Sequence, residues 1–162
     1  MSSLFHGSEL CEVDAEGNVA IPGFLGDALA AEQSPDLVVA KHEADACLIG
    51  YGRDHLTTLA ERAERRRLAD EDRGEDARNH YRRMRRTFGV AERLGRSPAT
   101  LRIPPAMRHL GRIGRLALFV GTGDSFEIWN PQLALESDDV HFRALAEFQL
   151  RMRGNSKTRG GR

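Results

Sequence analysis

The sequence predicts an α+β protein in which two similar β-rich halves flank a helical hairpin. Three observations predict this fold. Short apolar runs separated by turn residues occupy both ends of the 162-residue chain, a pattern typical of strands. The stretch 54–89 changes to helical spacing. The dipeptide Ile-Pro occurs at Ile21-Pro22 and again 82 positions later at Ile103-Pro104, which indicates duplication of a unit of roughly 45 residues.

The first half, residues 5–53, opens on two short strands and a turn. Apolar residues alternate from Cys11 to Ile21 around the segment Asp14-Ala15-Glu16-Gly17-Asn18. Gly and Asn both tolerate positive φ, so this composition predicts a tight turn between paired antiparallel strands.

A short helix and a hairpin complete this half. Pro22 ends the second strand, and residues 23–31 have helical spacing. The apolar side chains predicted on one side of this helix are Leu25, Ala28 and Leu29. Residues 37–40 and 46–51 are apolar runs joined by a polar segment, which predicts a second hairpin.

The insert, residues 54–89, predicts two helices. Asp54 is a candidate N-cap for the first, residues 70–74 interrupt the pattern, and Gly89 ends the second. Twelve arginines and eight acidic residues give positions 61–96 a charge of +4. Two interpretations remain open: the arginines contact a phosphate backbone, or they form ion pairs on a solvated hairpin that packs beside a neighbouring subunit.

The second half, residues 90–130, repeats the pattern of the first. A strand ends at Pro104, a short helix covers 105–110, and residues 116–129 form a hairpin around the turn Gly121-Thr122-Gly123-Asp124. Asn130-Pro131 then predicts the start of a C-terminal helix over 131–153. Residues 154–162 are basic and without apolar anchors, so we expect a disordered tail.

The charge and cysteine content exclude several classes of protein. Equal numbers of basic and acidic residues, 24 each, leave only local patches to support nucleic-acid binding. Cys11 and Cys47 stand too far apart for a CxxC site. The six histidines have no metal-binding spacing, and no nucleophile motif is present. We therefore expect no enzyme activity, cofactor, metal or small-molecule substrate.

The chain also shows no membrane or export signal. No stretch approaches the ~20 apolar residues of a membrane helix, and the N-terminus has no signal-peptide pattern. We expect a cytoplasmic protein without a membrane partner.

The two Ile-Pro elements and the C-terminal hairpin resemble the MraZ family of bacterial regulators of division and cell-wall genes. The segment Val13 to Pro22 is similar to the family signature Asp-x-x-Gly-Arg-x-x-Ile-Pro. Leu116 to Trp129 (L-A-L-F-V-G-T-G-D-S-F-E-I-W) is similar to the family's closing hairpin. The resemblance implies tandem swapped-hairpin, AbrB-like β-barrel halves. It also implies a nucleoid-associated, ring-like homo-oligomer that binds repeated elements in double-stranded promoter DNA.

The resemblance implies an Asp-x-x-x-Arg pair in each half, in which the arginine contacts DNA and the aspartate holds the loop and the arginine. This chain departs from that motif. Asp14 is retained but Asn18 occupies the arginine position, and Arg96 and Thr100 occupy the second pair. Arg102 shares strand parity with Arg96, so we expect these two arginines on one face if Pro98 leaves the alternation intact. The predicted DNA-binding residues are Asp14, Asn18, Arg96, Thr100 and Arg102.

Two functional hypotheses follow. The first is a DNA-binding transcriptional regulator whose site is weakened or relocated, because each lost arginine removes a charged contact. The second is an assembly protein that keeps the fold, has lost DNA binding and acts through protein partners. The basic insert and tail favour the first, and the substituted arginine positions favour the second.

Overall fold

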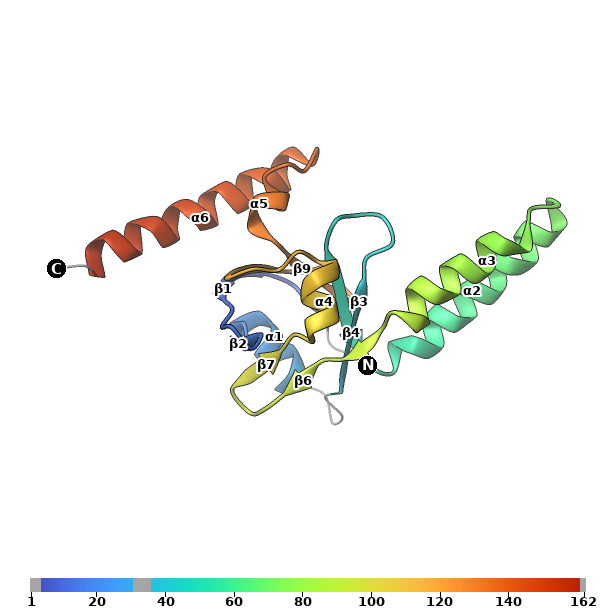
Figure 1. Ribbon diagram of the computed structural model, residues 1–162, viewed down its shortest axis with the longest axis horizontal. Helices are drawn as coiled ribbons and strands as arrows, with labels where there is room; N and C mark the ends of the chain where they lie inside the picture. The colour runs from blue at the N-terminus through green and yellow to red at the C-terminus, as the bar shows by residue number, and fades with distance from the viewer. Residues whose placement is uncertain (1–3, 31–35, 161–162) are drawn as a thin grey trace.

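The computed structural model describes residues 4–30 and 36–160. The chain is an α+β protein, as predicted, with two antiparallel sheets, short helices beside them, and longer helices that extend away from them (Figure 1). None of the helices in the described ranges is long and apolar enough to cross a membrane.

The larger sheet interleaves strands from the two halves. Its six strands lie in the order β1-β8-β9-β4-β3-β5. Strand β1, from the first half, pairs with β8 of the second, and β5 of the second pairs with β3 of the first. Each hairpin, β3–β4 or β8–β9, is therefore flanked by a strand from the other half. The strands are β1 (Ser8–Glu12), β3 (Leu37–Lys41), β4 (Leu48–Gly52), β5 (Glu92–Arg93), β8 (Leu116–Gly121) and β9 (Phe126–Trp129).

The smaller sheet joins the two Ile-Pro elements directly. Its strands are β2 (Asn18–Ala20), β7 (Thr100–Arg102) and β6 (Gly95–Arg96), in the order β2-β7-β6. Val19 lies opposite Leu101, its own counterpart in the duplication. Equivalent hydrogen bonds flank this pair: the Ile21 amide donates to Ala99 O at 3.1 Å and the Ile103 amide to Gly17 O at 2.9 Å. A pseudo-two-fold axis thus passes between β2 and β7.

The turn at residues 14–18 forms, but the strands beside it do not pair with each other. The Gly17 amide donates to Asp14 O at 3.0 Å and closes the turn. Strand β1 then pairs with β8, and β2 pairs with β7. The expected local hairpin is therefore wrong, because the duplicated half supplies a better partner for each strand. The second predicted hairpin is confirmed, since Leu37 lies opposite Gly52 in β3–β4.

The core lies between the sheets and two equivalent short helices. Helices α1 (Gly23–Ala30) and α4 (Pro105–Leu110) follow the two Ile-Pro pairs. Leu25 and Met107, three residues after each proline, are both buried in the main core. The side chains predicted on the inner side of α1 are the buried ones, Leu25, Ala28 and Leu29.

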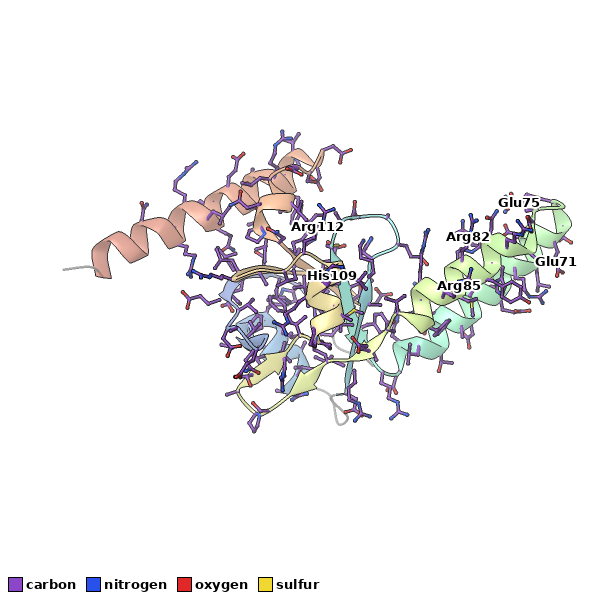
Figure 2. The ribbon with its side chains drawn as sticks, in the orientation of Figure 1. Glu71, Glu75, Arg82, Arg85, His109 and Arg112 are labelled. Atoms are coloured by element: carbon purple, nitrogen blue, oxygen red, sulfur yellow. The ribbon has the colours of Figure 1, made fainter. Side chains whose placement is uncertain are left out.

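The insert forms a two-helix arm that projects from the sheets (Figure 1). It consists of α2 (His55–Asp72), α3 (Ala77–Met84) and a π-helical turn η1 (Arg85–Gly89). Asp54 precedes α2 without capping it through its side chain, whereas Asp76 caps α3 by accepting from the Arg78 amide at 3.0 Å. Figure 2 shows charged side chains along the arm, Glu71 and Arg82 among them.

A buried carboxylate joins the two helices of the arm. Asp70, only 6% exposed, accepts from Arg73 at 2.8 Å and also from Arg83 on the opposing helix. Burial alone would raise the pKa of Asp70, but the hydrogen bonds from Arg83 and Arg73 outweigh burial and lower it. The interleaved charges of the insert therefore include an ion-pair network that closes the arm.

Removal of this carboxylate is expected to loosen the arm. Asp70→Asn should speed amide hydrogen exchange across α3, because the charged hydrogen bond to Arg83 is lost. Since the pKa of Asp70 is lowered in the fold, its contribution is complete above the ordinary aspartate pKa and is lost as the pH falls through the folded value. Wild-type α3 should therefore exchange like the variant in acid. Asp72→Asn, at an exposed site on α2, is the control. If α3 of Asp70→Asn exchanges as slowly as in wild type, or no faster than in Asp72→Asn, this role of Asp70 is contradicted.

The C-terminal region contains two helices where one was predicted. Asn130 caps α5 (Pro131–Ala134), accepting from the Gln132 amide at 2.9 Å. Asp139 then accepts from the amides of His141 and Phe142 and starts α6 (Val140–Gly160). This second cap accounts for the break.

Helix α6 also continues past Gly154, where the sequence predicted its end and a disordered tail. A single glycine costs a helix only about 1 kcal/mol relative to alanine, and no proline follows it. The rings of Trp129 and Phe142 pack together, with their centroids 4.9 Å apart, and this contact fixes the start of α6 against the sheet. The last two residues of the predicted tail, 161 and 162, lie outside the described part of the chain.

Candidate nucleic-acid interface

The turn at residues 14–18 is organised by the Asp14 carboxylate. It accepts from the Glu16 amide at 2.9 Å, the Asn18 amide at 2.8 Å and the Asn18 side-chain Nδ2 at 3.1 Å. These donors, the Asn18 backbone amide foremost, lower the pKa of Asp14. Asp14 is therefore engaged inside its own turn, where it sets the position of Asn18.

Residues of the second half of the chain pack against this turn and donate hydrogen bonds to it. Gly17 has a φ of +91°, and a Cβ added there would lie 2.6 Å from Ile103 O, so the turn packs closely on β7. Two arginines donate to its carbonyls: Arg108 Nη1 to Ala15 O at 3.1 Å, and Arg102 Nε to Glu16 O at 3.3 Å. Arg108 was not predicted as a site residue, because one arginine in a short helix carries no local signal.

Asn18 has little freedom to donate to a ligand. Its Nδ2 is shared between the carboxylates of Asp14, at 3.1 Å, and Glu16, at 3.4 Å. Within the described residues its Oδ1 takes part in no hydrogen bond, and an amide oxygen can accept from the exocyclic amino group of a base. Asn18 therefore offers a neutral acceptor, where an arginine at this position would offer charged donors.

Strand register places Arg102 beside Asn18 but separates Arg102 from Arg96. Arg102 lies directly opposite Asn18 across β2–β7, and Gly95 is opposite Arg102 on its other side. Arg96 is opposite the buried Leu101, so it points toward the other face of the sheet. The expected shared face of the two arginines is wrong.

The cause of this change of face is a two-residue turn. The Ser97 amide donates to Thr100 O at 2.9 Å, which closes a hairpin around Pro98 and Ala99. Strand parity reverses across such a turn, and Pro98 sits where no ladder donor is required. The Thr100 hydroxyl is 2.7 Å from the Ser97 hydroxyl. The structure thus brings Asp14, Asn18 and Arg102 together and leaves Thr100 and Arg96 at the far end of the small sheet.

His42, Cys47 and Glu127 lie close together like metal ligands, but their hydrogen bonds do not suit a metal ion. One ring nitrogen of His42, Cys47 Sγ and a Glu127 carboxylate oxygen lie within 4.8 Å of one another. His42 Nδ1, however, accepts from the backbone amides of Ala44 and Asp45 at 3.1 and 3.0 Å. The ring proton must then reside on Nε2, 3.2 Å from Glu127, and burial raises the pKa of the Cys47 thiol. These residues form a hydrogen-bonded cluster that closes the β3–β4 loop.

Comparison with known proteins gives a consistent set of relatives. No family model matches the chain. The chain is 32% identical over 134 residues to a protein of Rhodospirillum rubrum named transcriptional regulator MraZ, covering 82% of this chain and 83% of that protein. Proteins of the same name from Saccharophagus degradans and Shewanella oneidensis are 27% and 26% identical, over 89% and 84% of this chain and 89% and 86% of their own lengths.

Proposed function

Because the chain belongs to the MraZ family, we propose that it is a DNA-binding transcriptional regulator of division and cell-wall genes. Its curated relatives are named transcriptional regulators, and the protein is not an enzyme. It would bind promoter repeats on the nucleoid as a ring-like homo-oligomer. The exchange of β1 and β5 between the halves supports swapped-hairpin, AbrB-like units as its DNA-binding element.

The proposed contact surface is the outer face of β2 and β7 together with the turn at residues 14–18. The observation that carries it is the register of β2–β7, which places Arg102 beside Asn18 on a turn held by Asp14. Arg102 is exposed and uses its Nε inside the protein, so its two terminal amino groups can bind a phosphate or a guanine edge. Thr100, two positions from Arg102 on β7, extends this surface along the strand, whereas Arg96 lies on the opposite face of the small sheet and is not part of it.

One copy of this surface binds DNA weakly. The carboxylates of Asp14 and Glu16 offset the charges of Arg102 and Arg108, and Asn18 adds no charge. Affinity then depends on several copies acting together. Helix α6 carries apolar side chains that a partner copy could cover, with Val140, Phe148 and Met152 each more than half exposed, and these support a homo-oligomer.

Fluorescence anisotropy tests the proposal. Labelled DNA from upstream of the gene and a scrambled DNA of equal length are titrated with the full chain at two salt concentrations. We expect tighter binding to the upstream DNA and a steep loss of affinity with salt. Equal weak binding to both DNAs would instead support an assembly protein that keeps the fold and acts through protein partners.

Arg102→Ala is expected to weaken binding to the upstream DNA by about 1–3 kcal/mol, or roughly 5–150-fold. If Arg102 binds a phosphate, the slope of log affinity against log salt also falls by about 0.9. If it binds a base, the slope is kept and discrimination from scrambled DNA is reduced.

Arg65→Ala provides the matched control, because Arg65 is an exposed arginine on α2. It should bind as wild type does. Thermal melting of both variants checks that Arg102→Ala has not unfolded the turn. Wild-type affinity in a folded Arg102→Ala protein would remove this residue from the interface.

A further inference from the structure

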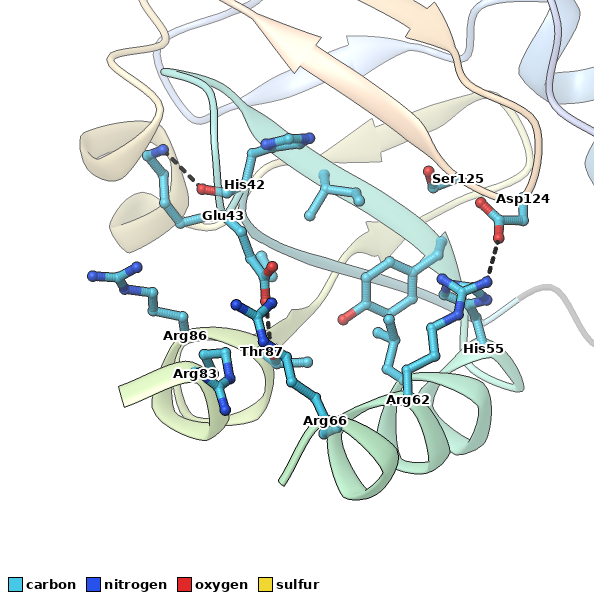
Figure 3. A pocket seen from close by; sticks show the side chains of 16 residues that line it. His42, Glu43, His55, Arg62, Arg66, Arg83, Arg86, Thr87, Asp124 and Ser125 are labelled. Atoms are coloured by element: carbon cyan, nitrogen blue, oxygen red, sulfur yellow. Dashed lines mark hydrogen bonds and ion pairs between the residues drawn. The ribbon is translucent and has the colours of Figure 1, made fainter. Parts of the chain in front are cut away.

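A cavity of about 360 Å³ lies between the arm and the larger sheet. Its walls come from β3, β4 and the loop between them, from α2, α3 and η1, and from the turn between β8 and β9 (Figure 3). This volume is within the range of small-molecule sites. The cavity is separate from the proposed DNA surface, and His42, which pairs with Glu127, forms part of its wall.

The floor of the cavity is apolar and contains an unpaired hydroxyl. Tyr51 on β4 is 1% exposed, and its buried hydroxyl has no hydrogen-bond partner among the described residues. Its ring packs on that of His55, with centroids 5.2 Å apart. The apolar residues around it are Ala40, Ile49, Leu59 and Ala63. Buried polar groups are nearly always paired, so this hydroxyl indicates a site for a partner that enters the cavity.

The rim of the cavity is cationic on balance, because four arginines and Lys41 outnumber the carboxylates of Glu43 and Asp124. Four arginines from both helical segments of the arm surround the opening (Figure 3): Arg62, Arg66, Arg83 and Arg86. Arg62 pairs with Asp124 at 3.4 Å, and Arg83 pairs with Asp70. Arg66 and Arg86 have no carboxylate partner within the described ranges.

The charges and the floor together define a class of ligand. We propose that this cavity binds a small anion with an apolar ring, whose phosphate or carboxylate is held by Arg66 and Arg86 and whose ring lies over Tyr51. Arginine forks bind either anion strongly, and the apolar floor excludes a fully hydrated ion. The Tyr51 hydroxyl donates to a polar atom of the ligand. This site is independent of DNA binding, and its ligand is bound without being transformed.

Isothermal titration calorimetry with simple probes tests the class. The probes are 1-naphthyl phosphate and 1-naphthoate, with neutral 1-naphthol and inorganic phosphate as controls that carry only the ring or only the anion. We expect at least one anionic ring probe to bind one site per chain with a Kd below about 1 mM, and at least tenfold more tightly than either control. Comparison of the two ring probes decides between phosphate and carboxylate. Failure of both, or equal binding of 1-naphthol, overturns the proposal.

Charge reversal at the rim tests the location. The double variant Arg66→Glu/Arg86→Glu should weaken the bound probe more than about tenfold, since two charged contacts are lost. Arg78→Glu/Arg82→Glu makes the same change at exposed positions of the same arm outside the cavity and should bind within about twofold of wild type. An equal loss in both double variants would show a non-specific charge effect and overturn the assignment.

Tyr51→Phe separates a ligand contact from a structural role. The variant keeps the buried ring and removes a hydroxyl that has no partner, so the unliganded protein should melt at the wild-type temperature or higher. Probe affinity should nevertheless fall by about fivefold or more for a polar ring such as a hydroxylated naphthoate. A lowered melting temperature with unchanged affinity would show that the hydroxyl serves the fold, contrary to the proposal.

Discussion

Asn18→Arg is expected to raise the affinity for upstream DNA by at least about tenfold. Each restored phosphate contact steepens the salt slope by about 0.9, and the gain multiplies over the copies of an oligomer. The Asp14 carboxylate, which now accepts from Asn18 Nδ2 at 3.1 Å, can hold the new guanidinium over β2. Anisotropy at two salt concentrations measures both the affinity and the slope.

Two control variants separate the effect of position 18 from the effect of an added positive charge. Asn79→Arg adds the same charge at an exposed position on α3 and should leave discrimination between upstream and scrambled DNA unchanged. Asn18→Gln lengthens the amide without a charge and should not tighten binding. If Asn18→Arg binds no better than Asn79→Arg, the turn at residues 14–18 is not the DNA-contacting element.

Gly17→Ala is expected to have the largest effect on the fold of the site, destabilising the protein by roughly 2–4 kcal/mol. At a φ of +91° an alanine is strained, and its Cβ would lie 2.6 Å from the backbone oxygen of Ile103 and 2.9 Å from Arg108 Nε. The turn would have to lift from β7, which breaks the Arg108 bond to Ala15 O. Differential scanning calorimetry should show a melting temperature lower by about 5–15 °C, together with reduced DNA binding.

Gly114→Ala is the matched control for this substitution. A Cβ at Gly114 would meet no atom within 4 Å, and its φ is outside the left-handed region. It should melt close to wild type. A Gly17→Ala protein that melts with the control would show that the close packing of the turn on β7 contributes little to stability.

The local elements follow from local sequence. The turn at residues 14–18, helix α1 and the Asn130 cap each depend on residue types a few positions apart, and all three form as predicted. Helix ends were less accurate, because Asp139 begins a new helix and Gly154 does not end one. The energies that decide such boundaries are about 1 kcal/mol, which packing readily outweighs.

The candidate site was predictable only in part. Asp14 and Asn18 belong to one contiguous turn, and spacing alone placed them together. Arg102 joins them only through the β2–β7 register, and Arg108 only because α4 packs beneath the turn. The face of Arg96 depended on the turn at Pro98, whose two-residue length reversed the strand parity.

The sequence by itself determined that this protein is a duplicated α+β chain with a charged helical insert. The evidence was the repeated Ile-Pro pair and the change of hydrophobic period at residue 54, both of which depend on neighbouring residues. Only the tertiary structure decided that each half lends a strand to the other, which arginines meet the turn, and that the arm covers an apolar cavity over Tyr51. These features arise from contacts between segments far apart in the chain. Local preferences do not decide which of these segments pair, and the apolar surface buried in the complete fold does.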